Sequence, residues 1–331
     1  MTHSALGSTK AAELRSTRDL RSSGSVLVLV AAAGLVPLLT QNPFYLHLGV
    51  LIYLNAIFVM GLGIIARVGQ LSFAHGAFAA IGAYSSVHAV MGLGMPYLAG
   101  VALGAAVAGM LAAAIGWIIL RLRGVYFVLV TFSIGELTRL LLLDFPAISG
   151  GANGLTGVPP ASFLGFELAS KTSAYYYALI AAALVFVFAY ALVRSPVGRA
   201  FAAIEENAAL AEGSGIDTRS FQVLAFVIGS AVAGGGGAML AHYIGFISPE
   251  TFNLHFSIAI IIMLVVGGRK SLAGPIVGAL FLTPLPELLR ATVALQHILF
   301  GFILILALRF LPEGLAGIRV YRRKSTGVEN K

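Results

Sequence analysis

The chain has no cysteine, a single tryptophan and few charged side chains, which make up 10% of its 331 residues. Without cysteine, neither a disulfide framework nor a thiolate metal site can form. Hydrophobic residues make up 59% of the chain, and its mean hydropathy is +0.95. A composition so rich in apolar residues excludes an ordinary soluble domain. The sequence therefore predicts an all-α integral membrane protein.

The motifs of common catalytic sites are also missing. The P-loop pattern GxxxxGK[ST] does not occur, because no lysine directly follows a glycine, and neither HExxH nor GxSxG occurs. We therefore expect no enzymatic activity and no cofactor or metal bound by this chain. If transport is driven by nucleotide, ATP and Mg²⁺ must be used by partner subunits.

Apolar runs give the expected membrane spans. A straight helix needs roughly 20 residues to cross the hydrocarbon core. The eighth and ninth runs, at 256–268 and 272–285, are shorter than this, which favours a broken or re-entrant pair of helices. We predict about ten transmembrane or re-entrant helices. The runs cover residues 25–40, 46–66, 70–91, 97–120, 124–143, 174–193, 220–244, 256–268, 272–285 and 294–309.

The basic residues predict the orientation of these spans. When the chain is threaded from a cytoplasmic N-terminus, all but three of the 21 Lys and Arg fall on the cytoplasmic side. Of those three, Lys171 and Arg290 lie outside and Arg139 lies within a span. The net charge of +8 is then an orientation signal, and a nucleic-acid role loses its support. An even number of spans places both termini in the cytoplasm.

This threading divides the chain into segments. We expect a cytoplasmic tail at 1–24, a transmembrane domain at 25–318 and a second cytoplasmic tail at 319–331. Within the transmembrane domain, residues 194–219 form a cytoplasmic loop and residues 144–173 an extracytoplasmic loop.

The cytoplasmic loop carries the one long charge-rich helical pattern in the sequence. Ser195 and Pro196 are typical of a helix N-cap and first position, and Gly213 and Gly215 of a helix end. Apolar side chains recur on one narrow stripe, which fits a groove in a soluble partner or, equally, the lipid surface or the protein's own helices. The stripe consists of Val197, Phe201, Ile204, Ala208 and Ala211.

Polar residues inside the predicted spans are candidates for the translocation path. Gln70, Ser72 and His75 interrupt an apolar run, and a histidine in lipid surroundings must find a protein partner or water. His75 either lines the path or packs against a neighbouring carbonyl. Glu136 and Arg139 are three residues apart, so they share one helix face. A structural ion pair is the favoured role, and a substrate carboxylate at Arg139 is the alternative.

The extracytoplasmic loop is dense in glycine and proline from residue 149 to 173, which predicts a compact ordered loop without regular helix. It is a candidate docking surface together with the segment 247–253. Its candidate residues are Asn153, Gly154, Thr156 and Gly157.

Seven stretches between residues 45 and 320 carry a resemblance. They are QLSFAHGAFAAIGAY, RLRGVYFVLVTFSIGELTRL, SGGANGLTGVP, SPVGRAFAAIEENAALAEGSGI, ISPETFNLHFSI, GGRKSLAGPIVGA and LPEGLAGI. In this order they resemble the LivM-type permeases of the branched-chain amino acid family of ABC importers. The histidine of FAHGAF, His75, favours the LivM side of the family over the LivH side.

The resemblance implies an alternating-access importer of a bacterial or archaeal plasma membrane. Its implied partners are a LivH-type permease, two cytoplasmic ABC ATPases and an extracytoplasmic substrate-binding protein. It also implies that the ATPase contact includes Ala211, Glu212, Gly215 and Ile216. Two features depart from the family pattern. The first is Glu205 together with Gly213 and Ser214, and it favours a helix that ends early or bends. The second is the charged turn at Arg269 and Lys270.

The substrate remains open at this point. Branched-chain or other small amino acids are the favoured cargo, but related permeases take urea, short amides, or aromatic or dicarboxylic acids. A secondary transporter that uses Glu136 and His75 as ion carriers is a competing class, and a membrane-embedded enzyme is a third.

Overall fold

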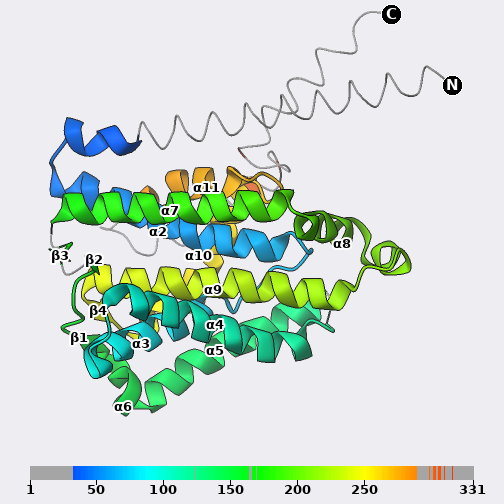
Figure 1. Ribbon diagram of the computed structural model, residues 1–331, viewed down its shortest axis with the longest axis horizontal. Coiled ribbons are helices and arrows are strands. Elements are labelled where there is room, and N and C mark those ends of the chain that lie inside the picture. Colours follow the sequence, from blue (N-terminus) through cyan, green and yellow to red (C-terminus); the bar gives the residue numbers. More distant parts are fainter. Residues whose placement is uncertain are drawn as a thin grey trace, which may run out of the picture.

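The computed structural model describes residues 33–122, 124–163, 166–168 and 170–288, with a few isolated positions beyond them. Within these residues, seven helices are long and apolar enough to cross a membrane, and one shorter apolar helical segment, Gly274–Pro286, follows them. The seven are Pro43–Ala66 (α2), His75–Leu93 (α3), Tyr97–Ile119 (α4), Val125–Asp144 (α5), Lys171–Arg194 (α7), Thr218–Ile244 (α9) and Pro249–Gly267, which contains α10 (Leu254–Gly267) (Figure 1).

The all-α membrane fold is confirmed, while the total of ten spans stays a prediction. Half of the run at 25–40 and most of the run at 294–309 fall outside the described residues, as do all of the predicted tails at 1–24 and 319–331. The broken or re-entrant pair also stays a prediction. The run at 256–268 forms the 14-residue α10, and a 3-10 turn at Pro249–Phe252 (η2), separated from it by the extended Asn253, lengthens the segment to Pro249–Gly267.

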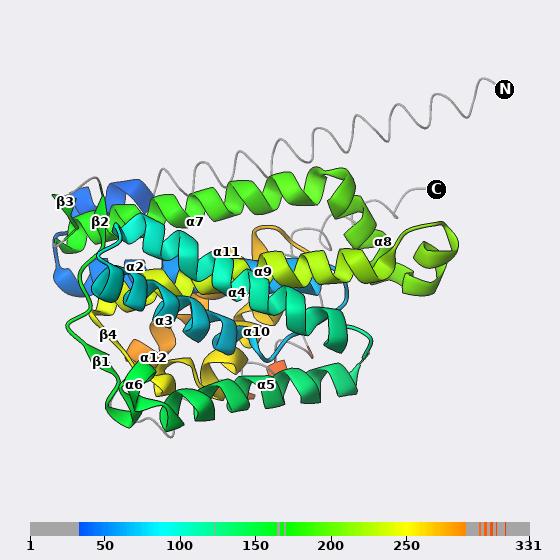
Figure 2. The same cartoon turned by 60° about the horizontal axis from the view of Figure 1, so that its bottom comes forward.

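Helix α9 lies at the centre of the bundle, packed against α2, α3 and α4. Figures 1 and 2 both place α7 and α5 at opposite edges. Glycines permit the closest crossings. A Cβ at Gly82 would overlap the backbone of Gly234, and a Cβ at Gly104 would overlap the Gly82 carbonyl. Small residues let membrane helices pack through their backbones, so α3, α4 and α9 meet at these three glycines.

Helix α3 begins inside the bundle. The predicted run starts at residue 70, but the chain is not helical before His75. The His75 ring contacts the Phe58 carbonyl, eight residues before the end of α2, which is roughly 12 Å along a helix. Buried amide groups in this segment need partners. Side-chain oxygens of Ser72, Thr131 and Ser257 accept hydrogen bonds from the amides of residues 74, 73 and 76, at 3.0 to 3.2 Å.

Helices α10 and α11 (Gly274–Leu282) form a tight hairpin around the turn at residues 268–273. A Cβ at Gly278 would overlap the Met263 carbonyl, and one at Gly267 would overlap the Gly274 carbonyl. A five-residue helix, Pro284–Leu288 (α12), follows. The close packing explains why glycine and apolar residues dominate this part of the sequence.

The end of the bundle opposite the helix Pro196–Gly213 (α8) carries short irregular elements. They are Pro146–Ser149 (α6), Gly151–Asn153 (η1), and the strands Leu155–Thr156 (β1), Ser162–Phe163 (β2), Phe166–Glu167 (β3) and Phe246–Ile247 (β4). Strand β1 pairs antiparallel with β4, and β2 with β3. The first pairing joins the two segments that were predicted to form one docking surface.

Helix α8 spans Pro196–Gly213 with the predicted N-cap, because the Ser195 hydroxyl accepts a hydrogen bond from the Gly198 amide at 3.3 Å. The helix bends, as the departures from the family pattern favoured, and the break lies at Asn207. Asn207 has an extended backbone, with φ −158° and ψ 104°. Its side-chain oxygen accepts from the amides of Ala209 and Leu210, at 3.0 and 3.1 Å, so it caps a second short helix.

Candidate functional site: the α8 surface and the intramembrane polar groups

The apolar stripe of α8 packs on the chain's own helices. Phe201, Ile204 and Ala211 are buried in a cluster with Ile64, Val68, Ala189 and Ala225, which come from α2 and its end, α7 and α9. Val197 and Ala208 are half-buried beside them. The groove for this stripe therefore lies in this chain, and its reading as a partner's groove is wrong for the three buried residues.

The opposite surface of α8 is exposed and is therefore available to a partner protein. Leu210 is the large apolar side chain on this surface, with 70% of its area exposed. Glu212, Gly213, Ser214 and Gly215 around it are exposed, and Ile216 is half-buried against the inner cluster. Gly215 has φ +85°, which favours glycine. An exposed leucine on a helix that is fixed from behind can enter a groove of a partner protein.

Glu205 connects α8 to the α10–α11 turn. Its carboxylate lies 3.7 Å from the Arg269 guanidinium. Arg67, at the end of α2, donates a hydrogen bond to the Lys270 carbonyl at 3.2 Å. Burial lowers the pKa of Arg67, and the nearby Glu205 carboxylate opposes that shift. Two of the departures from the family pattern, Glu205 and the charged turn, thus form one charge cluster.

Reversing the charge at Glu205 is the test of this cluster. We expect Glu205→Arg to destabilise the folded chain by about 1 kcal/mol, because partly exposed ion pairs contribute little and like charges repel by a similar amount. The double variant E205R/R269E should restore most of the loss in thermal unfolding. Glu206→Arg, next to it and exposed, is the control, and equal losses for the two arginine variants would contradict the pairing.

The polar residues predicted for the path near the start of α3 are buried. Gln70, Ser72 and His75 have at most 7% of their area exposed. His75 Nε2 lies 2.9 Å from the Phe58 carbonyl oxygen, which fixes its proton on that nitrogen, and its Nδ1 has no partner among the described residues. In this conformation His75 therefore packs against a neighbouring carbonyl, which is one of the two roles that the sequence left open.

Arg139 lies between two carboxylates. Its Nε donates to both Glu136 oxygens at 3.1 Å, and its Nη1 donates to Glu250, which precedes α10. The sequence predicted the first partner and missed the second, because Glu250 is distant in the chain and lies in a segment assigned to docking. A substrate carboxylate would need to displace both acids to reach Arg139.

Removing this guanidinium leaves two carboxylates facing one another. We expect Arg139→Gln to lower the free energy of unfolding by about 2 kcal/mol, since charged acceptors lose their donor. The double variant E136Q/R139Q should recover part of that loss, as measured by thermal unfolding in detergent. Identical melting for Arg139→Gln and the unmodified chain would show that the ion pairs do not stabilise the fold.

Helix α5, which carries this pair, is the least covered of the seven described spans. Among its residues only Phe127 and Thr131 are buried. Its exposed side is mostly apolar, with Val125, Tyr126, Leu129, Phe132, Leu137 and Leu140 all exposed. Glu136 and Arg139 are half-buried at its edge. A charged pair on a largely uncovered span points to a protein or a polar path beside it rather than lipid alone.

The predicted loop residues lie at the β1–β4 end. Asn153, Thr156 and Gly157 are exposed, and Gly154 is half-buried. Gly154 has φ +67°, and a Cβ there would overlap the Ile247 carbonyl. Glycine at this position therefore permits the pairing of β1 with β4.

The described residues contain no cluster of three or more metal-ligating side chains. The seven long apolar helices of the described residues form the architecture of a multi-pass integral membrane protein. A family model described as "Branched-chain amino acid transport system / permease component" matches residues 44–308. The chain belongs to this permease family, and it is a multi-pass protein of the plasma membrane.

Individual relatives agree with this membership. The chain is 30% identical over 321 residues to the high-affinity branched-chain amino acid transport system permease protein LivM of Escherichia coli (strain K12), covering 86% of this chain and 71% of the relative. It is 28% identical over 272 residues to the corresponding permease LivH of Salmonella typhimurium, covering 76% and 86%. Over 135 residues, it is 30% identical to the autoinducer 2 import system permease LsrC of Photorhabdus laumondii, covering 38% and 40%. No solved structure matches the chain. These relatives are transport permeases rather than enzymes.

Proposed function

We propose that this chain is the membrane permease subunit of an ATP-binding-cassette importer for branched-chain or other small amino acids. The observation that carries this proposal is α8, a helix held from behind by Phe201 and Ile204 and presenting Leu210 outward between two spans. Such a segment can pass a displacement from a soluble motor to α7 and α9.

The proposal assigns each free surface to one partner. The outer side of α8, from Leu210 to Gly215, meets a cytoplasmic ATPase, and a second copy of the ATPase serves a LivH-type permease. The uncovered face of α5 meets that second permease, with the path between them. The β1–β4 end receives the loaded binding protein. Both termini lie in the cytoplasm, and the partners, not this chain, use ATP and Mg²⁺.

Transport follows from alternating access. Closure of the ATPases moves α8, and the rigid cluster of Phe201, Ile204 and Ala211 transfers that movement to α2, α7 and α9. The charge cluster at Glu205 extends it to the α10–α11 hairpin. A cycle becomes directional only when the binding protein and the nucleotide favour different states. Selectivity then resides mainly in the binding protein, since Arg139, the guanidinium within the spans, is already held by Glu136 and Glu250.

The test is uptake by proteoliposomes that hold this chain with its second permease, the two ATPases and the binding protein. We expect labelled leucine to accumulate only when ATP is supplied on the side of the vesicle membrane that the ATPases face. ATP-dependent uptake of urea or an aromatic acid instead would retain the importer and change its cargo. Uptake by this chain alone, driven by an ion gradient and indifferent to ATP, would refute the proposal in favour of a secondary transporter.

A further inference from the structure

A closed ring of contacts links the β1–β4 end of the bundle to the ion pairs of Arg139. Strand β1 follows α5 through α6 and η1, and strand β4 leads directly into η2. The two strands pair with one another, and Arg139 of α5 pairs with Glu250 of η2. A partner that displaces the paired strands relative to α5 therefore acts on the Arg139–Glu250 pair.

The segment from β4 to α10 is short and internally bonded, so it can transmit such a displacement. Ile247 is buried, and the Thr251 amide donates a hydrogen bond to the Ser248 carbonyl at 3.1 Å. Asn253 has an extended backbone, and its side-chain oxygen accepts from the Phe256 amide at 3.1 Å. Because Asn253 alone separates η2 from α10, η2 can turn about this residue while α10 stays in place.

The two carboxylates that Arg139 contacts have different consequences for the fold. Glu136 lies three residues away on the same helix, so its pair with Arg139 connects no second segment. Glu250 connects α5 to η2, and the side chains of Arg139 and Glu250 are 20% and 54% exposed. Ion pairs that water reaches contribute little to stability. Docking can therefore break the Arg139–Glu250 pair, and Glu136 keeps the guanidinium paired after Glu250 leaves.

A small hollow lies next to these ion pairs, between α5 and η2. Its volume of about 10 Å³ is the lower limit for a single water molecule. Arg139 follows Glu136 by one helical turn in the direction of the β1–β4 end, so the Arg139–Glu250 pair lies between that end and the hollow. An amino acid cannot enter a space of this size. The hollow is lined by Phe73, Phe132, Gly135, Glu136, Phe252, Asn253, Leu254 and Ser257.

The buried start of α3 meets α5 and η2 around the same hollow. The Ser257 hydroxyl oxygen accepts a hydrogen bond from the Gly76 amide at 3.0 Å, and a Cβ at Gly76 would lie 2.9 Å from the Phe252 carbonyl oxygen. On the other side, a Cβ at Gly135 would lie 3.4 Å from the Phe73 carbonyl oxygen. Separating η2 from α5 therefore opens a way from the β1–β4 end to the start of α3.

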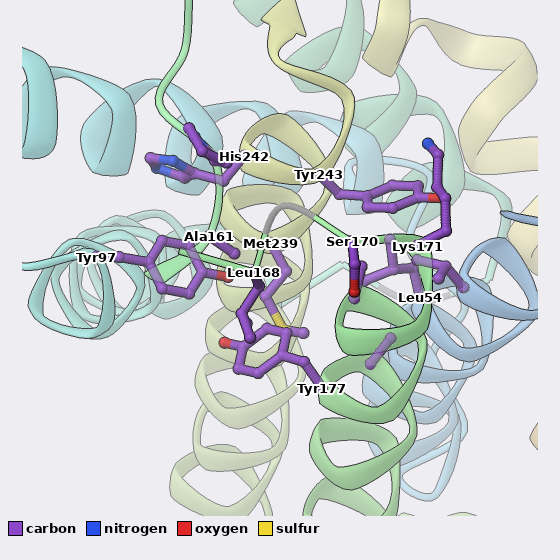
Figure 3. A pocket seen from close by; sticks show the side chains of 14 residues that line it. Leu54, Tyr97, Ala161, Leu168, Ser170, Lys171, Tyr177, Met239, His242 and Tyr243 are labelled. Atoms are coloured by element: carbon purple, nitrogen blue, oxygen red, sulfur yellow. The ribbon is translucent and has the colours of Figure 1, made fainter. Parts of the chain in front are cut away.

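A larger cavity at the same end of the bundle is not controlled by this ion pair. It encloses about 100 Å³ between α2, α4, α7 and α9, and Figure 3 shows Leu54, Tyr97 and Met239 in its wall. None of its described lining residues comes from α5 or η2. This cavity lies on the α7 side of the bundle, so it takes no part in a separation of α5 from η2.

We propose that the Arg139–Glu250 pair is an outer latch, which keeps η2 against α5 and the hollow closed until the loaded binding protein docks. Docking on the β1–β4 end turns η2 about Asn253, withdraws Glu250 from Arg139 and opens the hollow toward the docking side. This inference rests on the proposed importer function, because it uses the surface assigned there to the binding protein.

The first experiment measures how fast a thiol in the hollow reacts. The chain has no cysteine, so Ser257→Cys, at a buried lining position, provides a single thiol. A small methanethiosulfonate reagent is added to the assembled importer on the side that β1–β4 faces. We expect loaded binding protein to accelerate the reaction. Adding Glu250→Gln should accelerate it about fivefold without binding protein, which is the population change that the loss of one exposed ion pair permits.

Two further acid-to-amide changes control this result. Glu136→Gln removes a carboxylate from the same guanidinium but no link between segments, so it should not accelerate the reaction. Asp144→Asn removes an exposed charge from the end of α5 and should leave the rate unchanged. The latch is refuted if Glu250→Gln reacts as slowly as the parent, or if Glu136→Gln accelerates the reaction as much.

A reversible cross-link tests whether the latch must open during transport. In the variant R139C/E250C, a bifunctional thiol reagent with a disulfide in its spacer joins α5 to η2. We expect ATP-dependent leucine uptake to stop on cross-linking and to return in the same sample when the spacer is reduced. Undiminished uptake by the cross-linked protein would show that the two segments never separate, as a purely structural ion pair requires, and would overturn the proposal.

Failure of the latch and failure of the importer give different results. If the unmodified complex accumulates leucine with ATP but Glu250→Gln does not change the thiol reaction, the latch is wrong and the importer stands. If the unmodified complex shows no ATP-dependent uptake of any solute, the importer proposal fails and the latch fails with it.

Discussion

Valine at Gly82 is expected to abolish accumulation of the folded chain in the membrane. The Cβ that valine adds would overlap the Gly234 backbone, and the Gly104 backbone packs on the same point. Neither neighbour is a flexible side chain, so the helices α3, α4 and α9 must separate. Overpacking a tight core costs about 1 to 3 kcal/mol, and we expect at least the upper value where three backbones meet.

The matched control for this variant is Gly92→Val on the same helix. Gly92 is exposed, and a Cβ there would meet no atom within 4 Å. Fluorescence-detected size-exclusion chromatography should therefore show a normal monodisperse peak for Gly92→Val and little or none for Gly82→Val. Equal folded yields from the two variants would show that the glycine crossing does not determine the packing.

Aspartate at Leu210 is expected to reduce ATP-driven uptake at least tenfold while the chain folds normally. Leu210 is 70% exposed, so its replacement removes almost no internal contact. If it inserts into the ATPase, the substitution places a carboxylate in an apolar contact, and the loss of an interface anchor costs about 2 kcal/mol or more. The measurement is leucine uptake by the reconstituted complex, with the rate of ATP hydrolysis measured beside it. Hydrolysis that continues without uptake shows that the two are uncoupled.

Two neighbours on α8 control this result. Ala202→Asp adds the same charge at an exposed position before the break at Asn207 and should transport normally. Phe201→Asp places the charge in the buried cluster and should prevent folding. Normal transport by Leu210→Asp would remove Leu210 from the ATPase contact, and a similar loss from Ala202→Asp would point to a general charge effect.

Local signals in the sequence predicted much of this architecture. Ser195 and Pro196 fixed the start of α8, and Gly213 its end, because capping and helix termination depend on a few adjacent residues. Length and apolarity located the seven long helices of the described residues. The Glu136–Arg139 pair was predicted from its spacing of three, since that spacing places two side chains on one helix face.

The remaining features depend on contacts between distant segments. The α8 stripe was compatible with a partner's groove until Ile64, Ala189 and Ala225 were placed behind it. Glu250 reaches Arg139 only through the fold, because the two residues are 111 positions apart in the sequence. The break in α8 did have a signal, because Asn207 is a residue that caps helices and is disfavoured within them.

The most direct test of the central claim, that the outer side of α8 receives the ATPase, is photo-cross-linking from residue 210. Because the chain has no cysteine, Leu210→Cys carries a thiol-directed benzophenone at one position only. We predict a covalent adduct with the ATPase whose yield changes with nucleotide, and none from Ala152→Cys, exposed at the opposite end of the bundle. An ATPase adduct from position 152, or none from position 210 in a complex that transports, would contradict the account.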